Sequence, residues 1–384
     1  MRFSLLFATL LILTINPVCR AQKSSAAQSY LNRGIDRLAK GEVDGAIADF
    51  NVALTFDSAW ALAYVSRGNA LATRGSIQAA LNDYDIAIDI DPKRAEAYNS
   101  RGLARRMIGD IDAAISDFDK AIALRPKFAE AYNNRANARM AEQDIDNAIS
   151  DYNRALEIRP HFPQALSNRA AARFKRQDLD GAIADCNKAI AIAPRSAGGF
   201  VNRATVRIAR GDLQGAAADV ERALGIDPNC AEAHFDRGLI SLRNDTDTAI
   251  AEFTRAIEIN PRLQQAFISR GDARYDKRDY SGAAGDYNRA IELAPSQASV
   301  YNNRGTALLL LGDLDGATSD FNKAIEIDSR DYEAYVNRGL VLLMQSRIPE
   351  AERDFNYALE LAGQSRPIVE ERVNQIKRRL ALPR

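Results

Sequence analysis

The chain has 384 residues with 51 basic and 51 acidic side chains, so its formal charge is balanced. A nucleic-acid-binding protein would show a basic stripe or a marked positive charge, so we expect no nucleic acid as a partner. The sequence also lacks low-complexity tracts and long polar stretches, so we expect folded structure along most of its length.

The first predicted element is an export signal at the N-terminus. Arg2 precedes an apolar run over residues 3–13, and Ala21 is a small residue suited to cleavage. The run falls short of the roughly 20 residues that span a bilayer, and this layout is typical of a secretory signal peptide. We therefore predict a signal peptide at residues 1–21, a short lead-in at 22–26, and a periplasmic or secreted mature protein.

Two other interpretations of this segment stay open. Residues 1–21 can instead be the disordered or helical start of a cytosolic protein, or Cys19 can carry a lipid. The three residues before Cys19, which are Asn16, Pro17 and Val18, match a lipoprotein signal poorly. We therefore expect neither lipid anchoring nor any membrane contact beyond export.

From residue 27 onward the sequence repeats itself. An arginine followed by Gly or Ala recurs every 34 residues, with one interval of 33. These arginines are Arg33, Arg67, Arg101, Arg135, Arg169, Arg203, Arg237, Arg270, Arg304 and Arg338. Self-similarity at a period between about 20 and 50 residues indicates a solenoid rather than separate globular domains.

Each period predicts two antiparallel helices. Positions are counted from the arginine, so Tyr98 lies at −3 and Gly102 at +1 of the unit around Arg101. Positions −3, 0, +1 and +4 share one helical face. On the second helix, Ala at +13, usually an aromatic residue at +17, and Ala at +20 share another face. Small residues at +1 and +13 are expected to let the backbones approach closely, and neighbouring pairs must stack to bury the remaining apolar surface.

These residues resemble the tetratricopeptide repeat. The third unit reads Tyr98-x2-Arg101-Gly102, then Ala114-x3-Phe118, then Ala121 and Pro126, which fits the 34-residue pattern of that family. Two positions depart from the pattern, because Arg replaces the usual Leu, and position +4, usually aromatic, is Arg in six units. The resemblance implies an all-α fold, a right-handed superhelical solenoid of antiparallel helix pairs, over residues 27–365. The ten predicted units are 27–60, 61–94, 95–128, 129–162, 163–196, 197–230, 231–263, 264–297, 298–331 and 332–365.

An acidic residue follows every arginine at a fixed distance. The distance is sixteen residues, except in the shortened seventh unit, where Glu252 lies fifteen residues after Arg237. The antiparallel register places this acid on the facing helix, where a guanidinium can donate two parallel hydrogen bonds to the carboxylate. We expect ten structural ion pairs, among them Arg101–Asp117, Arg135–Asp151 and Arg304–Asp320. An active site is one constellation, so ten copies argue against catalysis by these arginines.

The resemblance also implies that the first helices line the inner wall of the superhelix. Asparagines are frequent at the positions expected there, and a few apolar side chains accompany them. The candidate groove residues are Asn99, Asn133, Asn134, Asn137, Met140, Asn168, Phe174, Asn202, Asn302 and Asn303. An amide side chain both donates and accepts hydrogen bonds, so such a row can hold an extended peptide backbone. The row is similar to the asparagine ladder of O-linked N-acetylglucosamine transferase, another tetratricopeptide superhelix.

This wall also has plainer interpretations. The asparagines can cap or solvate their helices, and Met140 and Phe174 can serve packing alone. In the binding interpretation, no asparagine is expected on the face between paired helices, so changing them should leave the fold intact. Convex-side residues such as Asp119 and Lys120 are expected to play no part in binding.

The last predicted element is a capping helix with a tail at residues 366–384. Val369, Val373, Ile376 and Leu380 fall on one helical face and can cover the open end of the last unit. The basic residues 377–379 can instead contact anionic lipid or polysaccharide.

No motif for chemistry stands out. The two histidines, His161 and His234, have no Cys, Asp or Glu at metal-ligand spacing, and the glycines form no phosphate loop. We therefore expect no enzyme activity, no cofactor and no metal. The predicted function is an exported, monomeric module that binds a partner protein or extended peptide in its concave groove. The alternative is a structural scaffold of cell-envelope or polysaccharide-export machinery that uses its edges and convex face.

Overall fold

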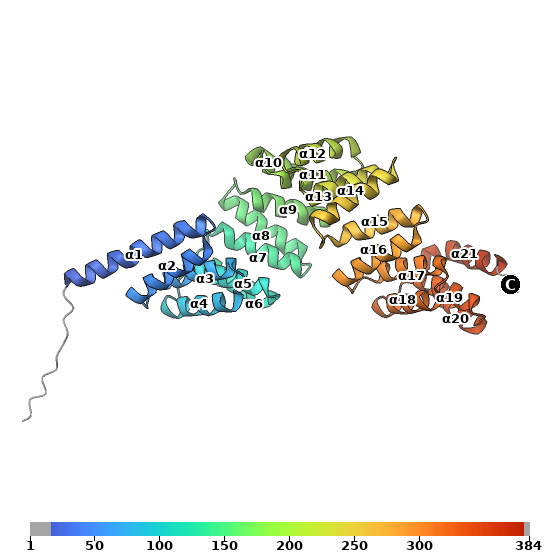
Figure 1. Ribbon diagram of the computed structural model, residues 1–384, viewed down its shortest axis with the longest axis horizontal. Helices are drawn as coiled ribbons and strands as arrows, with labels where there is room; N and C mark the ends of the chain where they lie inside the picture. The colour runs from blue at the N-terminus through green and yellow to red at the C-terminus, as the bar shows by residue number, and fades with distance from the viewer. Residues whose placement is uncertain (1–16, 380–384) are drawn as a thin grey trace, which may run out of the picture. The chain divides into compact units, whose positions relative to one another are not determined.

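Helix follows helix along residues 17–379, the part of the chain that this computed structural model describes (Figure 1). The helices form consecutive antiparallel pairs, numbered one to ten from the N-terminus. The first helices are α1 (Pro17–Ala39), α3 (Ala61–Thr73), α5 (Ala95–Met107), α7 (Ala129–Ala141), α9 (Pro163–Lys175), α11 (Ala197–Arg210), α13 (Ala231–Ser241), α15 (Gln264–Asp276), α17 (Ala298–Leu311) and α19 (Tyr332–Met344). The second helices are α2 (Val43–Phe56), α4 (Ile77–Ile90), α6 (Ile111–Leu124), α8 (Ile145–Ile158), α10 (Leu179–Ile192), α12 (Leu213–Ile226), α14 (Thr246–Ile259), α16 (Tyr280–Leu293), α18 (Leu314–Ile327) and α20 (Ile348–Leu361). A short 3-10 helix, η1 (Gly363–Ser365), and α21 (Arg366–Arg379) follow pair ten.

The predicted signal peptide falls mostly on residues 1–16, which lie outside the described residues, as do residues 380–384. α1 begins at Pro17 and continues without a break through the predicted cleavage position and the lead-in at 22–26. No helix among the described residues is both long and apolar enough to cross a bilayer. Cleavage and export therefore stay predictions.

In every pair except pair seven, the turn between the two helices contains a residue with a left-handed backbone. Glycine occupies this place in several pairs, for example Gly211, whose φ is +85°, because glycine adopts positive φ without a steric penalty. Asp212 follows and accepts a hydrogen bond from the Gly215 N–H at 2.9 Å. This side chain satisfies an N–H that the first turn of α12 leaves without a helical partner, and so marks where the helix begins.

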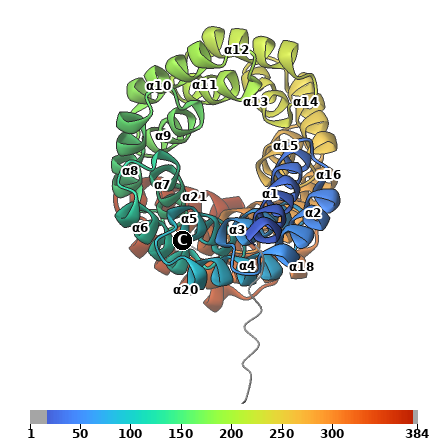
Figure 2. The ribbon, with the colours of Figure 1, turned by 90° about the vertical axis from the view of Figure 1, so that its left-hand side faces the viewer.

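Packing divides the chain into two units, Met1–Ile192 and Ala193–Arg384. In each unit a helix packs mainly on its partner in the pair, and then on the first helix of the next pair. Figure 2 shows this layering in the second unit, where α11, α13 and α15 line the inner side and α12 and α14 lie outside. The predicted all-α solenoid of antiparallel helix pairs is confirmed for the described residues. The boundaries assigned to its repeating units stay a prediction.

The glycine at +1 makes room for a ring. A Cβ at Gly68 would lie 2.5 Å from the ring of Tyr84, the residue at +17, and the other glycines at +1 meet a ring in the same way. In pair six, where Val220 replaces the ring, the residue at +1 is Ala204, and both side chains are buried. Gly or Ala at +1 therefore packs directly against the side chain at +17, and pair four shows that Ala136 also fits beside a ring, that of Tyr152.

α21 covers the end of the second unit, as predicted for a capping helix. Val369 and Val373 are buried in one apolar cluster with Phe355, and Ile376 packs against that cluster. Leu380 lies outside the described residues. At the basic end, the Lys377 ammonium donates a hydrogen bond to Glu352 at 2.7 Å. This lysine is therefore engaged in holding α21 on pair ten.

Candidate functional site

The arginine at position 0 holds both its own pair and the preceding one. Arg135 donates from Nε to Asp151 at 2.8 Å and from Nη2 to the other carboxylate oxygen at 2.5 Å. Its Nη1 donates to Asp119 on α6 of the preceding pair, also at 2.5 Å. Burial opposes the charge of Arg135, but the hydrogen bonds to Asp151 and Asp119 outweigh it and raise the pKa of the guanidinium. Asp119 therefore helps to join two neighbouring pairs. The sequence predicted only that Asp119 lies on the convex side and did not reveal this contact.

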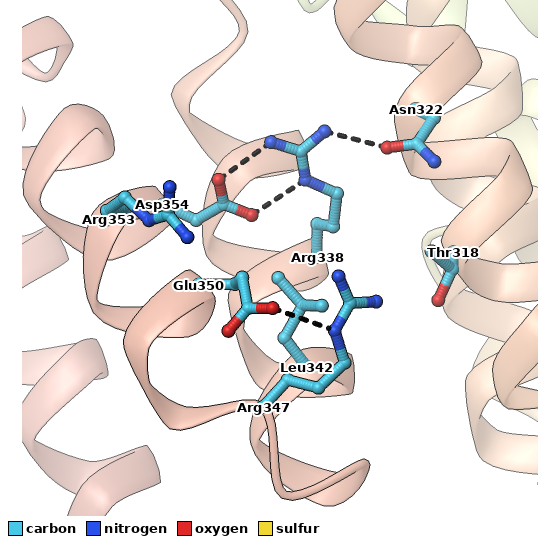
Figure 3. Close-up of a pocket in the computed structure, with 8 residues that line it drawn as sticks. All are labelled: Thr318, Asn322, Arg338, Leu342, Arg347, Glu350, Arg353 and Asp354. Carbon is cyan, nitrogen blue, oxygen red and sulfur yellow. Dashed lines mark hydrogen bonds and ion pairs between the residues drawn. The ribbon is translucent and has the colours of Figure 1, made fainter.

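The same fork recurs in pairs one to six and eight to ten. It joins Arg33 to Asp49, Arg67 to Asp83, Arg101 to Asp117, Arg135 to Asp151, Arg169 to Asp185, Arg203 to Asp219, Arg270 to Asp286, Arg304 to Asp320 and Arg338 to Asp354. Figure 3 shows it in pair ten, where Arg338 also donates to Asn322 of pair nine at 2.7 Å. In pair seven Arg237 contacts Glu252 through Nη2 at 2.8 Å.

A second arginine at +4 shares the carboxylate in six pairs. In pair four, Arg139 donates from Nη1 to the Asp151 oxygen already bonded to Arg135 Nε, at 2.7 Å. Pair ten has Leu342 at this position, and a cavity of about 290 Å³ lies beside it (Figure 3). Because Leu342 replaces the arginine that six other pairs carry at this position, we do not interpret the cavity as a ligand site.

Asparagines on successive first helices are hydrogen-bonded to one another. Asn134 donates to Asn99 at 2.9 Å, and Asn168 donates to Asn133 at 3.1 Å. In the second unit, Asn337 donates to Asn302 at 2.9 Å. Asn99 and Asn133 are buried. Each of these amide pairs joins neighbouring first helices, so these asparagines contribute to the stacking of one pair on the next, whereas the expectation concerned the face between paired helices.

Asn137 has a different partner within its own pair. The Tyr152 hydroxyl donates to the Asn137 amide oxygen at 2.5 Å, and Tyr84 donates to Asn69 at 2.8 Å in the same way. In pair eight the acceptor at this place is a carboxylate, since Tyr287 donates to Asp272 at 2.7 Å. This hydrogen bond could have been predicted from the sequence. Every unit with Tyr at +17 has Asn or Asp at +2, and no unit with Phe at +17 has either residue there.

The other candidate groove residues lie on first helices of both units. Met140 on α7 packs partly against the apolar cluster around Ala136, and Phe174 on α9 is half-buried. In the second unit, Asn202, Asn302 and Asn303 are half-buried, and Asn303 donates to Asp272 at 3.3 Å. The first helices thus present partly accessible amides and apolar groups on one face of each unit.

Among the described residues, no metal-binding cluster accompanies this face. Among residues 17–379, no group of three or more His, Cys, Asp or Glu side chains is placed to hold a metal ion. His234, the histidine at a ring position, bonds to Glu252 at 2.7 Å and to the Pro228 carbonyl at 3.2 Å. Its imidazole therefore has a structural partner on each side.

Family models match several stretches of the chain. Models described as tetratricopeptide repeat match residues 129–162, 201–263 and 268–332, and one described as TPR repeat matches 68–109 and 102–141. Together these stretches cover more than half of the chain. The chain belongs to the tetratricopeptide repeat family. A comparison with curated proteins finds no match.

A solved structure shows the same fold. A tetratricopeptide repeat protein from Parabacteroides merdae has 20% identity and a TM-score of 0.53, with 65% of this chain and 99% of that chain covered. PilF of Pseudomonas aeruginosa has 17% identity and a TM-score of 0.49, with 55% and 96% covered. The likeness to the Parabacteroides merdae protein concerns the helical fold alone. Tetratricopeptide repeats indicate a protein–protein interaction module, and the partner of this one is a matter for proposal.

Proposed function

We propose that this tetratricopeptide protein binds an extended segment of a partner protein along the first helices of its repeats. The observation that carries the proposal is the row of linked amides on α5, α7 and α9. An amide side chain offers two N–H donors and a carbonyl with two acceptor sites. Asn134 and Asn168 each use one N–H to reach the preceding helix, which leaves further donor and acceptor capacity on a half-buried face.

An extended backbone suits this face. A peptide in an extended conformation presents N–H and C=O groups at regular intervals, and amides can pair with both regardless of the peptide sequence. The amide–amide bonds between α5, α7 and α9 fix the direction of each side chain before binding, which lowers the entropy cost of recognition. Phe174, half-buried on α9, supplies an apolar contact that can prefer some side chains over others.

The test uses a partner captured from envelope extracts and a binding titration on folded variants. Changing Asn134, Asn168 and Phe174 together to Ala removes two amide pairs and the apolar contact. Each lost hydrogen bond contributes about 0.5–1.5 kcal/mol, so we expect the triple change to weaken binding about ten-fold or more. Thermal melts of the variant must be measured first, because the two amides also join neighbouring helices.

The control lies on the second helices. Lys120 on α6 and Lys188 on α10 occupy the same position of pairs three and five, and both are exposed. The double change to Ala should leave affinity unchanged. Loss of binding with the lysine changes, together with normal binding by the triple variant, would instead support an assembly scaffold that uses its convex face.

A further inference from the structure

The second unit contains a cavity of about 430 Å³ on the face formed by first helices. It is lined from α15, α16, α17 and α19, with Arg372 reaching in from α21. Three carboxylates border it, those of Asp272, Asp276 and Glu333, together with the ring of Tyr275. Arg372 is the one cationic side chain among the lining residues, so the cavity carries a net negative charge.

The charge of Asp272 is not required by the fold. Asn69 and Asn137 occupy the same position in pairs two and four, and each accepts the tyrosine hydroxyl that Asp272 accepts in pair eight. A neutral amide therefore suffices for this hydrogen bond. The carboxylate at residue 272 adds a negative charge that the other two pairs do without. Partial burial raises the pKa of Asp272, and the hydrogen bond from Tyr287 acts in the opposite direction.

Asp272 and Asp276 differ from the aspartates of the joints. Each joint aspartate forms an ion pair with one or two arginines, as Asp286 does with Arg270 and Arg274 at 2.6 and 2.9 Å. Within residues 17–379, the contacts of Asp272 are hydrogen bonds from Tyr287 and Asn303, and neither Asp272 nor Asp276 has an ion-pair partner. Two neighbouring carboxylates on α15 thus remain available to a cation.

The cavity already holds one guanidinium of this chain. Arg372 forms an ion pair with Glu333 and donates to the Asn337 amide oxygen at 2.8 Å. Arg372 lies 34 residues after Arg338, in phase with the repeat, yet it contacts α19 instead of forming the fork of the earlier arginines. A carboxylate and an amide of α19 therefore bind a planar cation on this face. Asp272 and Asp276 on α15 offer carboxylates of the same kind to a cation at the other end of the cavity wall.

Tyr275 completes the environment that a cation needs. Its ring lies edge-on to Tyr280, with the centroids 5.4 Å apart, which holds its orientation. A cation placed between carboxylates and an aromatic face gains both Coulomb attraction and cation–π attraction. We propose that Asp272, Asp276 and Tyr275 bind a lysine or arginine side chain of the partner segment. This inference rests on the proposed function, and it specifies the partner as a segment with a basic residue.

The probe is a displayed library of random twelve-residue peptides, selected on the full chain without its predicted signal. We expect Arg or Lys to be enriched at one position of the selected peptides. Replacing that residue by uncharged citrulline or norleucine should raise the Kd of a selected peptide about ten-fold, equivalent to roughly 1.4 kcal/mol. The variant D272N/D276N should bind the basic and uncharged peptides equally. It should keep the hydrogen bond from Tyr287, because Asn69 and Asn137 accept the hydroxyls of Tyr84 and Tyr152 in the same way.

The control is Asp315→Asn, which removes an exposed charge from α18 and should preserve the preference for the basic peptide. Selected peptides without a basic position, or a basic preference that survives D272N/D276N, would overturn this inference while leaving the proposed function standing. A selection that enriches no peptide over the starting pool would contradict the proposed function and this inference with it.

Discussion

Each repeated arginine has several partners at once. Arg135 forks onto Asp151, reaches Asp119 of the preceding pair, and lies with its guanidinium carbon 5.4 Å from the ring centroid of Tyr132. Buried ion pairs are offset by the cost of removing charges from water. Here the ion pairs mainly fix geometry. The two parallel hydrogen bonds from the guanidinium require one orientation of the facing carboxylate, and this selects one register for the two helices.

Loss of the shared carboxylate in pair four should be costly. Asp151→Ala leaves Arg135 and Arg139 without their common acceptor, and these side chains are only 15% and 22% exposed. Breaking a buried pair by removing one partner costs about 3–5 kcal/mol. We expect a loss of this size in the free energy of unfolding, measured by urea denaturation.

Removing the whole cluster is the matched comparison. A variant with Arg135, Arg139 and Asp151 all changed to Leu leaves no buried charge without a partner, because Asp119, which loses Arg135, is 53% exposed to water. This variant should lose much less stability than Asp151→Ala. Equal stability of the single variant, the triple variant and the wild type would show that the ion pairs contribute nothing.

Among the elements, pair seven departs most from the common design. α13 has 11 residues and is the shortest α-helix between residues 17 and 379. Its arginine, Arg237, meets Glu252 in place of an aspartate, and its Nε atom is buried without a hydrogen-bond partner. A buried donor left without a partner costs about 1–3 kcal/mol. The interface between the two helices of pair seven should therefore be weaker than the same interface in the other pairs.

Hydrogen exchange should reveal this weakness. In a solenoid the stability is a sum over pairs and their interfaces, so a weak interface opens more often than its neighbours. We expect amides of residues 239–248 to exchange faster than the equivalent amides of pairs three and four. Mass spectrometry after deuterium labelling measures this, and uniform protection across these pairs would contradict it.

Pair seven also holds an acid with a raised pKa. Asp236 on α13 is buried and accepts a hydrogen bond from the Thr205 hydroxyl at 3.0 Å. Burial raises the pKa of Asp236 to about 7, against the lowering effect of the Thr205 hydrogen bond and with help from Glu232. The ordinary value in an unfolded chain is about 3.9. The folded state therefore binds a proton that the unfolded state releases between these pH values.

Because the pKa of Asp236 is higher in the folded state than in the unfolded state, the protein should be less stable at higher pH. The contribution of Asp236 becomes less favourable as pH rises from about 4 to about 7, and the full penalty is present above pH 7. Asp236→Asn should stabilise the protein at pH 8, by up to about 4 kcal/mol at roughly 1.4 kcal/mol per pKa unit, and much less at pH 5. Urea midpoints at the two pH values measure this, and an equal effect of the substitution at both would rule out the titration.

At the scale of the whole molecule, one pair design is used from α1 to α20, and the two units each stack five such pairs. Stacking buries the apolar face that a single pair would leave exposed. The face of the first helices keeps its polar groups partly accessible, and this is the surface available to a partner. The cell compartment in which the protein binds that partner depends on whether its N-terminal segment directs export.

Export is the prediction at this scale. The apolar run at residues 3–13 and Ala21 predict cleavage that leaves a mature N-terminus near Gln22. We expect N-terminal sequencing of the protein from an envelope fraction to begin there. Recovery of intact Met1 from the cytosol would contradict export, and a lipid on Cys19 would replace it with membrane anchoring.

The sequence by itself determined the helices, their pairing and the match of arginine to acid. All three follow from spacing along one chain, because a helical face recurs every three to four residues and an antiparallel turn sets which residues oppose each other. The distance of sixteen residues from Arg135 to Asp151 is such a local relation, and the structure places their side chains 2.5 Å apart.

Only the tertiary structure decided the contacts between pairs. The bonds from Arg135 to Asp119 and from Asn134 to Asn99 depend on how one pair stacks on the next and on the direction of each side chain. The repeat period predicts neither how one pair stacks on the next nor the direction of a side chain. The same reason explains Arg372, which continues the period in the sequence but turns toward Glu333 and Asn337, because α21 packs on pair ten through Val369 and Val373.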